Sequence, residues 1–125
     1  MNQSIHTPNA PAAIGPYSQA VQAGNLVFVS GQLPIDPATG EFAGATIAEQ
    51  TRQSLTNIRS ILEAAGYTMN DVVKTTVLLA DIGDFAPMNQ VYAEFFTDNK
   101  PARAAFAVRD IPKGALVEIE AVACK

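Results

Sequence analysis

Two segments of the chain carry hydrophobic residues at three- and four-residue steps, which is the spacing of an amphipathic helix. The first begins at Thr46, which forms a capping-box pattern with Glu49, and ends at Gly66, a residue suited to the left-handed conformation that stops a helix. The second begins at Asp84, which we expect to cap it. Each helix has one apolar stripe that we expect to pack on a core: Thr51, Leu55, Ile58, Ile61, Leu62 and Ala65 in the first, and Phe85, Met88, Val91, Tyr92, Phe95 and Phe96 in the second.

Other segments have the pattern of β-strands. Gly24-Asn25 is a two-residue link typical of a tight antiparallel hairpin, and later runs are rich in β-branched residues. Residues 7–17 contain three prolines and Gly15, so we expect them to be extended and rich in turns. The order ββαβαββ predicts an α+β fold, a two-layer sandwich in which a mixed β-sheet carries both helices on one face. The predicted strands are residues 18–23, 26–30, 72–79, 102–108 and 116–123.

The composition is that of a packed globular protein. The 125 residues suit a single domain spanning residues 1–125, and 48% of them are hydrophobic while only 16% are charged. The low charged fraction favours an oligomer in which sister subunits cover part of the surface. A net charge of −4 with scattered lysines and arginines argues against nucleic acid as the main partner. The chain has no long apolar run and no signal-like N-terminal pattern, so we expect a cytoplasmic protein without a membrane partner.

Several kinds of catalytic site are excluded by what the chain lacks. It has one histidine, one cysteine, no tryptophan and no glycine-rich phosphate loop. A metal site and a Cys/His dyad are therefore not expected. His6 lies in the N-terminal stretch, where a solvated role is the ordinary one, and Cys124 has no partner for an internal disulfide. Arginine, glutamate, tyrosine, serine and asparagine remain as candidates.

The last predicted strand carries two carboxylates on one side. Alternate residues from Val117 to Ala123 share the face that we expect beneath the helices, and Glu118 and Glu120 share the opposite face. Solvated glutamates would explain this pattern. Burial against another subunit would instead require hydrogen-bonding partners for both carboxylates.

Arg103 and Asn89 each have two possible roles. Arg103 shares its side of a strand with Ala105 and Ala107, so it is either an ordinary strand-end arginine in water or one with room beside it for a ligand. Asn89 lies close to the apolar face of its helix, and its amide either binds something specific or caps a nearby loop.

The chain resembles the Rid (RidA/YjgF) family in five motifs: Gly15-Pro16-Tyr17-Ser18, Ser30-Gly31-Gln32, Val73-Lys74-Thr75-Thr76-Val77, Pro101-Ala102-Arg103 and Val117-Glu118-Ile119-Glu120-Ala121. The similarity runs nearly end to end, and five motifs in the right order are far more specific than any one of them. The resemblance implies a homotrimer of chorismate-mutase-like subunits. Their open sheet faces would form a central barrel, with three active sites in the clefts between neighbours.

The resemblance also implies an activity. It is that of a 2-iminobutanoate/2-iminopropanoate deaminase, a metabolite-damage-control enzyme that hydrolyses reactive 2-imino and enamino acids to 2-keto acids and ammonia without a cofactor. Examples of its substrates are 2-aminoacrylate and 2-iminobutanoate. By position, Arg103 would hold the substrate carboxylate and Glu120 would handle the attacking water. The further substrate-binding residues implied are Tyr17, Ser30, Gly31 and Asn89.

One position departs from part of the family. Some relatives have a cysteine two residues after the arginine, where this chain has Ala105. Thiol chemistry is excluded there. The resemblance implies that this position contributes through its backbone carbonyl, and alanine should preserve that contribution. Phe106, which follows, faces the opposite way, and we expect it in the core.

Three other functions stay open. The first is a non-catalytic regulator that binds small carboxylates in the same cleft. The second is an RNA-acting translation inhibitor or endoribonuclease, as family members have been described; the charge pattern and the lack of a histidine or lysine base near a basic groove argue against it. The third is a chaperone-like holdase, which would be insensitive to Arg103→Ala.

Overall fold

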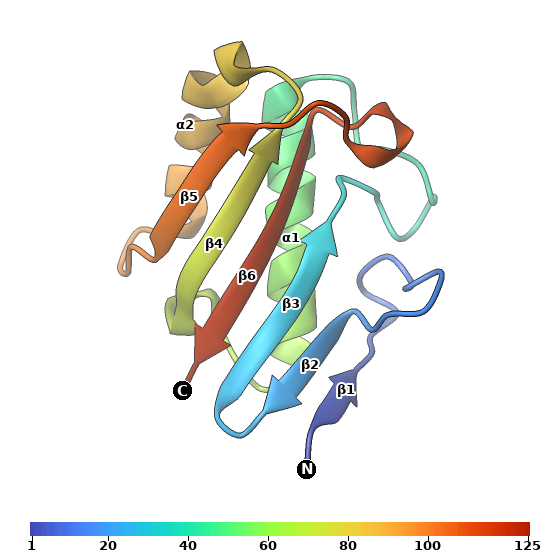
Figure 1. Ribbon diagram of the computed structural model, residues 1–125, viewed down its shortest axis with the longest axis vertical. Coiled ribbons are helices and arrows are strands. Elements are labelled where there is room, and N and C mark those ends of the chain that lie inside the picture. The colour runs from blue at the N-terminus through green and yellow to red at the C-terminus, as the bar shows by residue number, and fades with distance from the viewer.

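The computed structural model describes residues 1–125 and has two layers, a six-stranded β-sheet and two α-helices behind it (Figure 1). The elements are β1 (Gln3–Ile5), β2 (Ala20–Ala23), β3 (Leu26–Gln32), α1 (Ile47–Ala64), β4 (Val72–Leu79), α2 (Phe85–Phe95), β5 (Ala102–Ala107) and β6 (Val117–Cys124). The strand order is β1-β2-β3-β6-β4-β5, in which β4 and β5 are parallel and all other neighbours are antiparallel. This arrangement confirms the predicted α+β sandwich and is consistent with a chorismate-mutase-like fold.

The first helix begins and ends as the sequence predicts. The backbone N–H of Glu49 donates to the Thr46 hydroxyl (3.1 Å), and the Glu49 carboxylate accepts from the Thr46 N–H (3.2 Å), which completes the capping box. At the other end Gly66 adopts a φ of +81°, and the Tyr67 N–H donates to the Leu62 carbonyl. Neither α1 nor α2 combines the length and apolar character that a membrane span requires.

The start of the second helix differs from the prediction. Asp84 precedes α2, but its side chain forms no capping hydrogen bond. A short 3₁₀ turn, Ile82–Asp84, leads directly into α2, so Asp84 lacks the extended backbone of an N-cap residue. Asp81 instead caps this turn, because its carboxylate accepts from the Gly83 N–H at 2.8 Å.

The N-terminal strand was not predicted from the sequence. β1 pairs with β2, with Gln3 opposite Gln22 and Ile5 opposite Ala20. It has only three residues, two of them exposed and polar, so no two-residue alternation is long enough to be detected. The predicted hairpin is confirmed: β2 and β3 are joined at Gly24-Asn25, and Gly24 has a φ of +63°.

The core fills the space between the helices and the sheet. Leu55 and Ile58 of α1 have no exposed area, and α1 packs across β6. Val117 and Ile119 of β6 are equally buried, and Ala121 and Ala123 are no more than 3% exposed. The face predicted for the alternate residues of the last strand is therefore confirmed.

Phe106 is not a core residue, contrary to the expectation. It pairs with Leu78 on the sheet face that carries no helix, and it is 47% exposed. Phe28, opposite Val122 in the pairing of β3 with β6, is 47% exposed as well. The open face of the sheet, turned toward the viewer in Figure 1, thus carries apolar area that nothing in one chain covers.

Candidate active site

Arg103 lies on β5 with its side chain turned toward α2. Its Nη1 donates to Oδ1 of Asn89 at 2.7 Å. The guanidinium carbon lies 4.7 Å from the centroid of the Tyr92 ring and 5.4 Å from that of Phe85. No carboxylate of the chain forms an ion pair with it. Arg103 is therefore fixed in orientation while most of its N–H groups stay available to a ligand.

The spacing of α2 explains this arrangement. Phe85, Asn89 and Tyr92 lie four and three residues apart, so all three fall on the helix face that covers β5. The Tyr92 hydroxyl forms a buried hydrogen bond with the Thr75 hydroxyl at 2.8 Å. Burial raises the pKa of Tyr92, so its ring remains a neutral support beneath the arginine. Asn89 thus acts as a specific acceptor, one of the two roles that the sequence left open.

A hollow of about 410 Å³ adjoins the arginine. Its walls include Arg103 and Asn89 and continue with the apolar side chains of Tyr92 and Phe96. β5 is the last strand of the sheet, so one edge of its backbone, including the stretch at Ala105, is unpaired. The other residues of β5 are alanine and Phe106, so small side chains border the arginine.

Ser30 and Gly31 form a bulge in β3. Val29 pairs with Ala121 and Gln32 with Ile119, so the two residues between them lie opposite the single residue Glu120. The Ser30 hydroxyl donates to the Ser18 carbonyl at 2.6 Å. Bulges of this kind redirect side chains and backbone groups and often lie next to binding sites.

Glu118 lies closest to this bulge. Its carboxylate lies against Gly31 so closely that a Cβ at that position would overlap it. Burial raises the pKa of Glu118, and the negative charge of Glu120 raises it further. Glu120 itself is exposed on the same open face. The sequence pattern indicated Glu118 only as one of a pair of glutamates. The glycine at position 31, which leaves room for a carboxylate, was the signal that could have distinguished it from Glu120.

Tyr17 joins this second group of residues. It lies in the segment between β1 and β2 and is 55% exposed. Together with Gly31 it lines a hollow of about 260 Å³. The structure therefore brings Tyr17, Ser30, Gly31 and the two glutamates to one region of the sheet.

The Arg103 group and the Ser30–Gly31 group do not meet within one chain. β6 and β4 lie between β3 and β5, so the two strands are separated by roughly 14 Å at ordinary strand spacing. They also use different faces: Arg103 is paired with Thr75 on the helix side, whereas Glu118 and Glu120 lie on the open side. One chain thus holds two halves of the predicted site, well apart.

Known proteins identify the family. The sequence matches the family described as endoribonuclease L-PSP over residues 7–125. The crystal structure of the YjgF gene product of E. coli is 49% identical to this chain, with a TM-score of 0.95 and 98% of both chains covered. The chain belongs to the Rid (RidA/YjgF) family. A RutC family protein of Pyrococcus horikoshii is 59% identical, covering 100% of this chain and 99% of its own length. A 2-iminobutanoate/2-iminopropanoate deaminase of Bos taurus is 55% identical, covering 95% of this chain and 87% of its own length.

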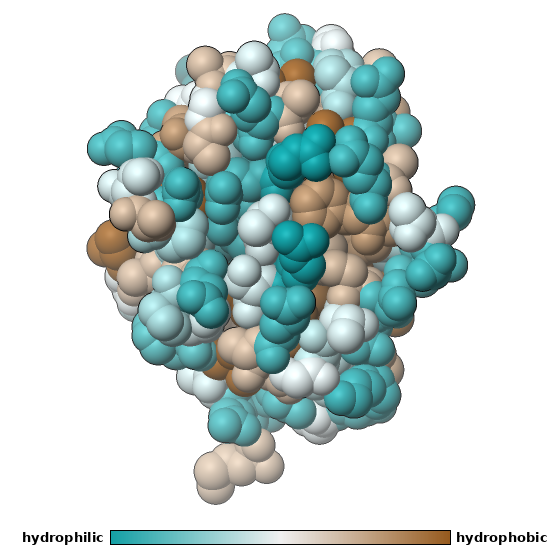
Figure 2. All heavy atoms as spheres, turned by 180° about the vertical axis from the view of Figure 1, so that it is seen from behind, coloured by the Kyte–Doolittle hydropathy of each residue, from teal (hydrophilic) through white to brown (hydrophobic).

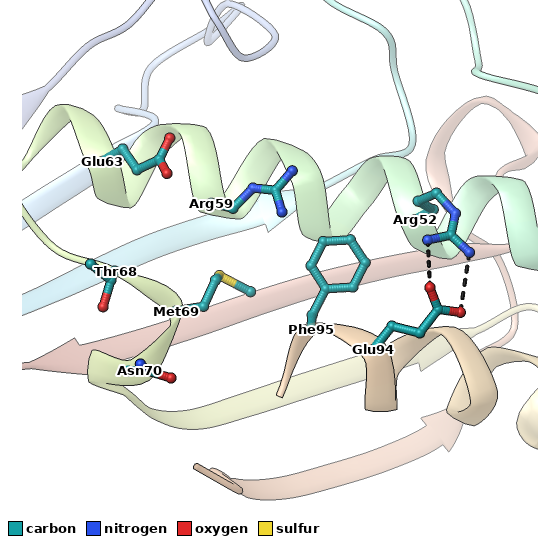
Figure 3. A pocket seen from close by; sticks show the side chains of 8 residues that line it. All are labelled: Arg52, Arg59, Glu63, Thr68, Met69, Asn70, Glu94 and Phe95. Atoms are coloured by element: carbon teal, nitrogen blue, oxygen red, sulfur yellow. Dashed lines mark hydrogen bonds and ion pairs between the residues drawn. The ribbon is translucent and has the colours of Figure 1, made fainter. Parts of the chain in front are cut away.

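A further hollow of this Rid protein, about 460 Å³, lies elsewhere, between α1 and α2 (Figure 3). Arg52 and Glu94 form a two-bonded ion pair at its rim, at 2.8 and 3.2 Å, and Arg59 stacks on Phe95. Figure 2 shows this helical face, where hydrophilic side chains surround a small hydrophobic patch. None of the predicted site residues lies there, and both members of the ion pair are about half exposed. Water would screen their charges, which makes this hollow a poor place for acid–base chemistry.

The remaining reactive side chains of this Rid protein stand apart from both halves of the site. His6 is exposed, and Cys124 is a partly buried free thiol at the end of β6. The structure gathers no three histidine, cysteine, aspartate or glutamate side chains in a way that would hold a metal ion.

Proposed function

We propose that this Rid protein hydrolyses small 2-imino acids to 2-keto acids and ammonia. The observation that carries the proposal is the Arg103 guanidinium, which is held by Asn89 and two aromatic rings yet has no carboxylate partner in the chain. The relative from Bos taurus, 55% identical, is named a deaminase for 2-iminobutanoate and 2-iminopropanoate. Substrates of that class carry a carboxylate next to the reacting carbon.

Arg103 is the proposed anchor for that carboxylate. A planar guanidinium can donate two parallel hydrogen bonds to a carboxylate, each charge-assisted bond contributing about 1.5–3 kcal/mol. Both bonds together fix the position of the imine carbon, which is the atom next to the carboxylate. The unpaired edge of β5 at Ala105 offers a backbone carbonyl beside this position.

The chemistry requires only water as a co-reactant. Water oxygen attacks the carbon of the protonated imine, and its proton is removed as the C–O bond forms. A proton then moves to the nitrogen of the tetrahedral intermediate. The C–N bond breaks and ammonia leaves, while the hydroxyl group gives its proton back to the base and becomes the C=O of the keto acid. An enamine such as 2-aminoacrylate first takes up a proton at its terminal carbon to give the same kind of imine.

The proton transfers are assigned to a carboxylate beside the Ser30–Gly31 bulge. Glu120 is the residue that the family resemblance implies, and it lies opposite the bulge. The carboxylate of Glu118 lies against Gly31, and burial raises its pKa, which suits a group that both accepts and returns a proton. We therefore propose Glu118 as the main acid–base group, with Glu120 as its charged neighbour.

The complete site is proposed to form between two copies of the chain in a homotrimer. One copy would supply Arg103, Asn89 and the Ala105 backbone, and its neighbour the second group: Tyr17, Ser30, Gly31, Glu118 and Glu120. Two observations support this: the halves lie on different faces of the sheet in one chain, and the open face exposes Phe28 and Phe106. Covering these aromatic rings favours assembly.

An assay of ammonia release tests the proposal, with 2-aminoacrylate produced in the assay mixture by a dehydratase. We expect the protein to accelerate the reaction over the uncatalysed background and Arg103→Ala to abolish that acceleration. Arg109→Ala is the matched control, because Arg109 is an almost fully exposed arginine that should not matter. Binding of a 2-keto acid without any acceleration would instead support a carboxylate-binding regulator. Cleavage of RNA that depends on Arg103 would support the activity in the family description.

A further inference from the structure

The segment that carries Tyr17 has little regular structure of its own. Residues 7–17 form most of the irregular loop that connects β1 to β2 (Figure 1). Its backbone forms one internal backbone–backbone hydrogen bond, from the Tyr17 N–H to the Gly15 carbonyl at 2.9 Å, and the Asn9 N–H donates to the Thr7 hydroxyl at 3.2 Å. Something else must therefore hold Tyr17 beside the Ser30–Gly31 bulge.

The buried amide of Gln19 forms that connection. Gln19 is 2% exposed, and its Oε1 accepts from the Thr7 N–H at 2.7 Å. Its Nε2 donates to the carbonyls of Pro11 (2.8 Å), Thr7 (3.1 Å) and Ala10 (3.3 Å). Both the oxygen and the nitrogen of this side-chain amide therefore bind backbone groups of the same loop. These hydrogen bonds tie the residues up to Pro11 to Gln19 and so close the loop between them.

The same residue connects the loop to the bulge. The Gln19 carbonyl accepts from the Ser30 N–H at 3.0 Å, next to the bond from the Ser30 hydroxyl to Ser18. Gln19 also lines the hollow that Tyr17 and Gly31 share. A shift of the loop would therefore move Tyr17 relative to Ser30 and Gly31, and not merely loosen the surface.

We propose that Gln19 is a positioning residue, whose amide holds residues 7–17 so that Tyr17 closes over the Ser30–Gly31 half of the site. Gln19 touches no substrate in this account and acts through Tyr17. The kinetic part of the inference rests on the proposed deaminase function. Its structural part, the fixing of the loop, does not.

A double-mutant cycle tests the kinetic part. Gln19→Met keeps the length of the side chain and removes its hydrogen bonds, and we expect it to lower kcat/KM about tenfold or more, since small misplacements of a positioned group have effects of this size. In a Tyr17→Ala background the same replacement should change kcat/KM less than twofold. An equal loss in both backgrounds would overturn the inference, because Gln19 would then not act through Tyr17.

Gln50→Met is the matched control. Gln50 is 4% exposed and its amide also bonds backbone groups, the Gly44 carbonyl and the Leu116 N–H, but it does not contact the Tyr17 loop. We expect it to lower the melting temperature as Gln19→Met does and to leave kcat/KM within twofold of the parent, measured well below unfolding. A loss of kcat/KM in Gln50→Met equal to that in Gln19→Met would show a general structural effect and overturn the inference.

Hydrogen exchange tests the structural part without any assay of turnover. The N–H groups of Thr7, Asn9 and Tyr17 are the hydrogen-bonded amides of this loop. We expect these three amides to exchange at least tenfold faster in Gln19→Met and to be unchanged in Gln50→Met. Unchanged exchange in Gln19→Met would overturn the inference even if the deaminase activity is found. Absence of turnover in the parent protein would overturn the proposed function and the kinetic part, while faster exchange would still establish Gln19 as the residue that holds the loop.

Discussion

Arg103 depends on a small number of contacts for its orientation. The guanidinium group has a single hydrogen-bonding partner in the chain, Asn89. The aromatic rings of Tyr92 and Phe85 limit its movement without fixing its plane. The amide of Asn89 is therefore expected to matter for the substrate rather than for the fold, since both Asn89 and Arg103 are exposed.

Asn89→Ala should lower kcat/KM about 10- to 100-fold, the equivalent of one hydrogen bond to a charged group of about 1.5–3 kcal/mol. Steady-state kinetics together with thermal unfolding measure this. Gln90→Ala, at the adjacent exposed position of α2, is the control and should change neither. A large drop in melting temperature for Asn89→Ala would contradict the assignment, because it would give the amide a structural role.

Glu118 and Glu120 make a pH-dependent prediction. The pKa of Glu118 is raised by burial and by the charge of Glu120, so kcat/KM should fall as the pH is lowered through that raised value and the base becomes protonated. Glu120→Gln removes the like charge and lowers the pKa of Glu118. The acidic limb of the pH profile of kcat/KM should therefore move to lower pH in this variant. Loss of turnover at every pH would assign the water to Glu120 and contradict the role given to Glu118.

At this scale the sequence offered candidate residues for the chemistry but did not show how they are arranged. The alternation of side chains along β6 correctly predicted that Glu118 and Glu120 lie on the same face of the sheet. It could not show that Glu118 lies against Gly31, because that contact depends on a bulge in β3, a strand distant in sequence. The contact of Arg103 with Asn89 likewise depends on the packing of α2 against β5.

Among the elements, α1 has the best defined start. Its capping box satisfies two backbone N–H groups, those of Thr46 and Glu49. Thr46→Ala should lower the free energy of unfolding by about 1 kcal/mol, measured by denaturant titration. Thr46→Ser keeps the hydroxyl and should retain most of the stability. An equal loss in both variants would mean that the threonine methyl group, and not the capping bond, is what stabilises the helix.

Elements with a clear periodicity were the ones that the sequence predicted. The stripe of α1 and the β-branched run of β4 extend over several turns or residue pairs, so each pattern repeats often enough to be recognised. β1 is too short for this, and the start of α2 is hidden by a 3₁₀ turn that shifts capping from Asp84 to Asp81. The missed features are thus the short and irregular ones.

The whole molecule is expected to function only as an assembly. If each site takes Arg103 from one copy and Glu118 from a neighbour, Arg103→Ala and Glu118→Gln are each inactive alone. Mixed in equal amounts, unfolded and refolded together, they should regain about a quarter of the parent activity, because random trimers contain intact pairs of halves at that frequency. Ammonia release by the mixture measures this. No recovery in trimers shown by mass to be mixed would place the site within one chain.

The composition favoured an oligomer, but it could not show how the subunits would be arranged. A charged fraction of 16% favoured an oligomer without saying which face would form the interface. In the structure Phe28 and Phe106 lie exposed on the open side of the sheet, and this is the face that we propose is covered. The hydrophobic pattern of one chain contains no information on contacts between copies. That the two halves of the site pair between subunits was therefore implied only by the family resemblance.

The alanine-rich edge strand next to Arg103 has a consequence for how this family can diversify. β5 contributes backbone pairing with β4, while alanines occupy four of its six positions and none of them is fully buried. Ala105 packs against the core, whereas Ala102 and Ala107 are exposed, so the fold makes few demands on these two side chains. Larger residues at Ala102 and Ala107 could reshape the surface of the strand that carries the arginine without disturbing the core, which makes β5 a natural place to alter substrate size by design.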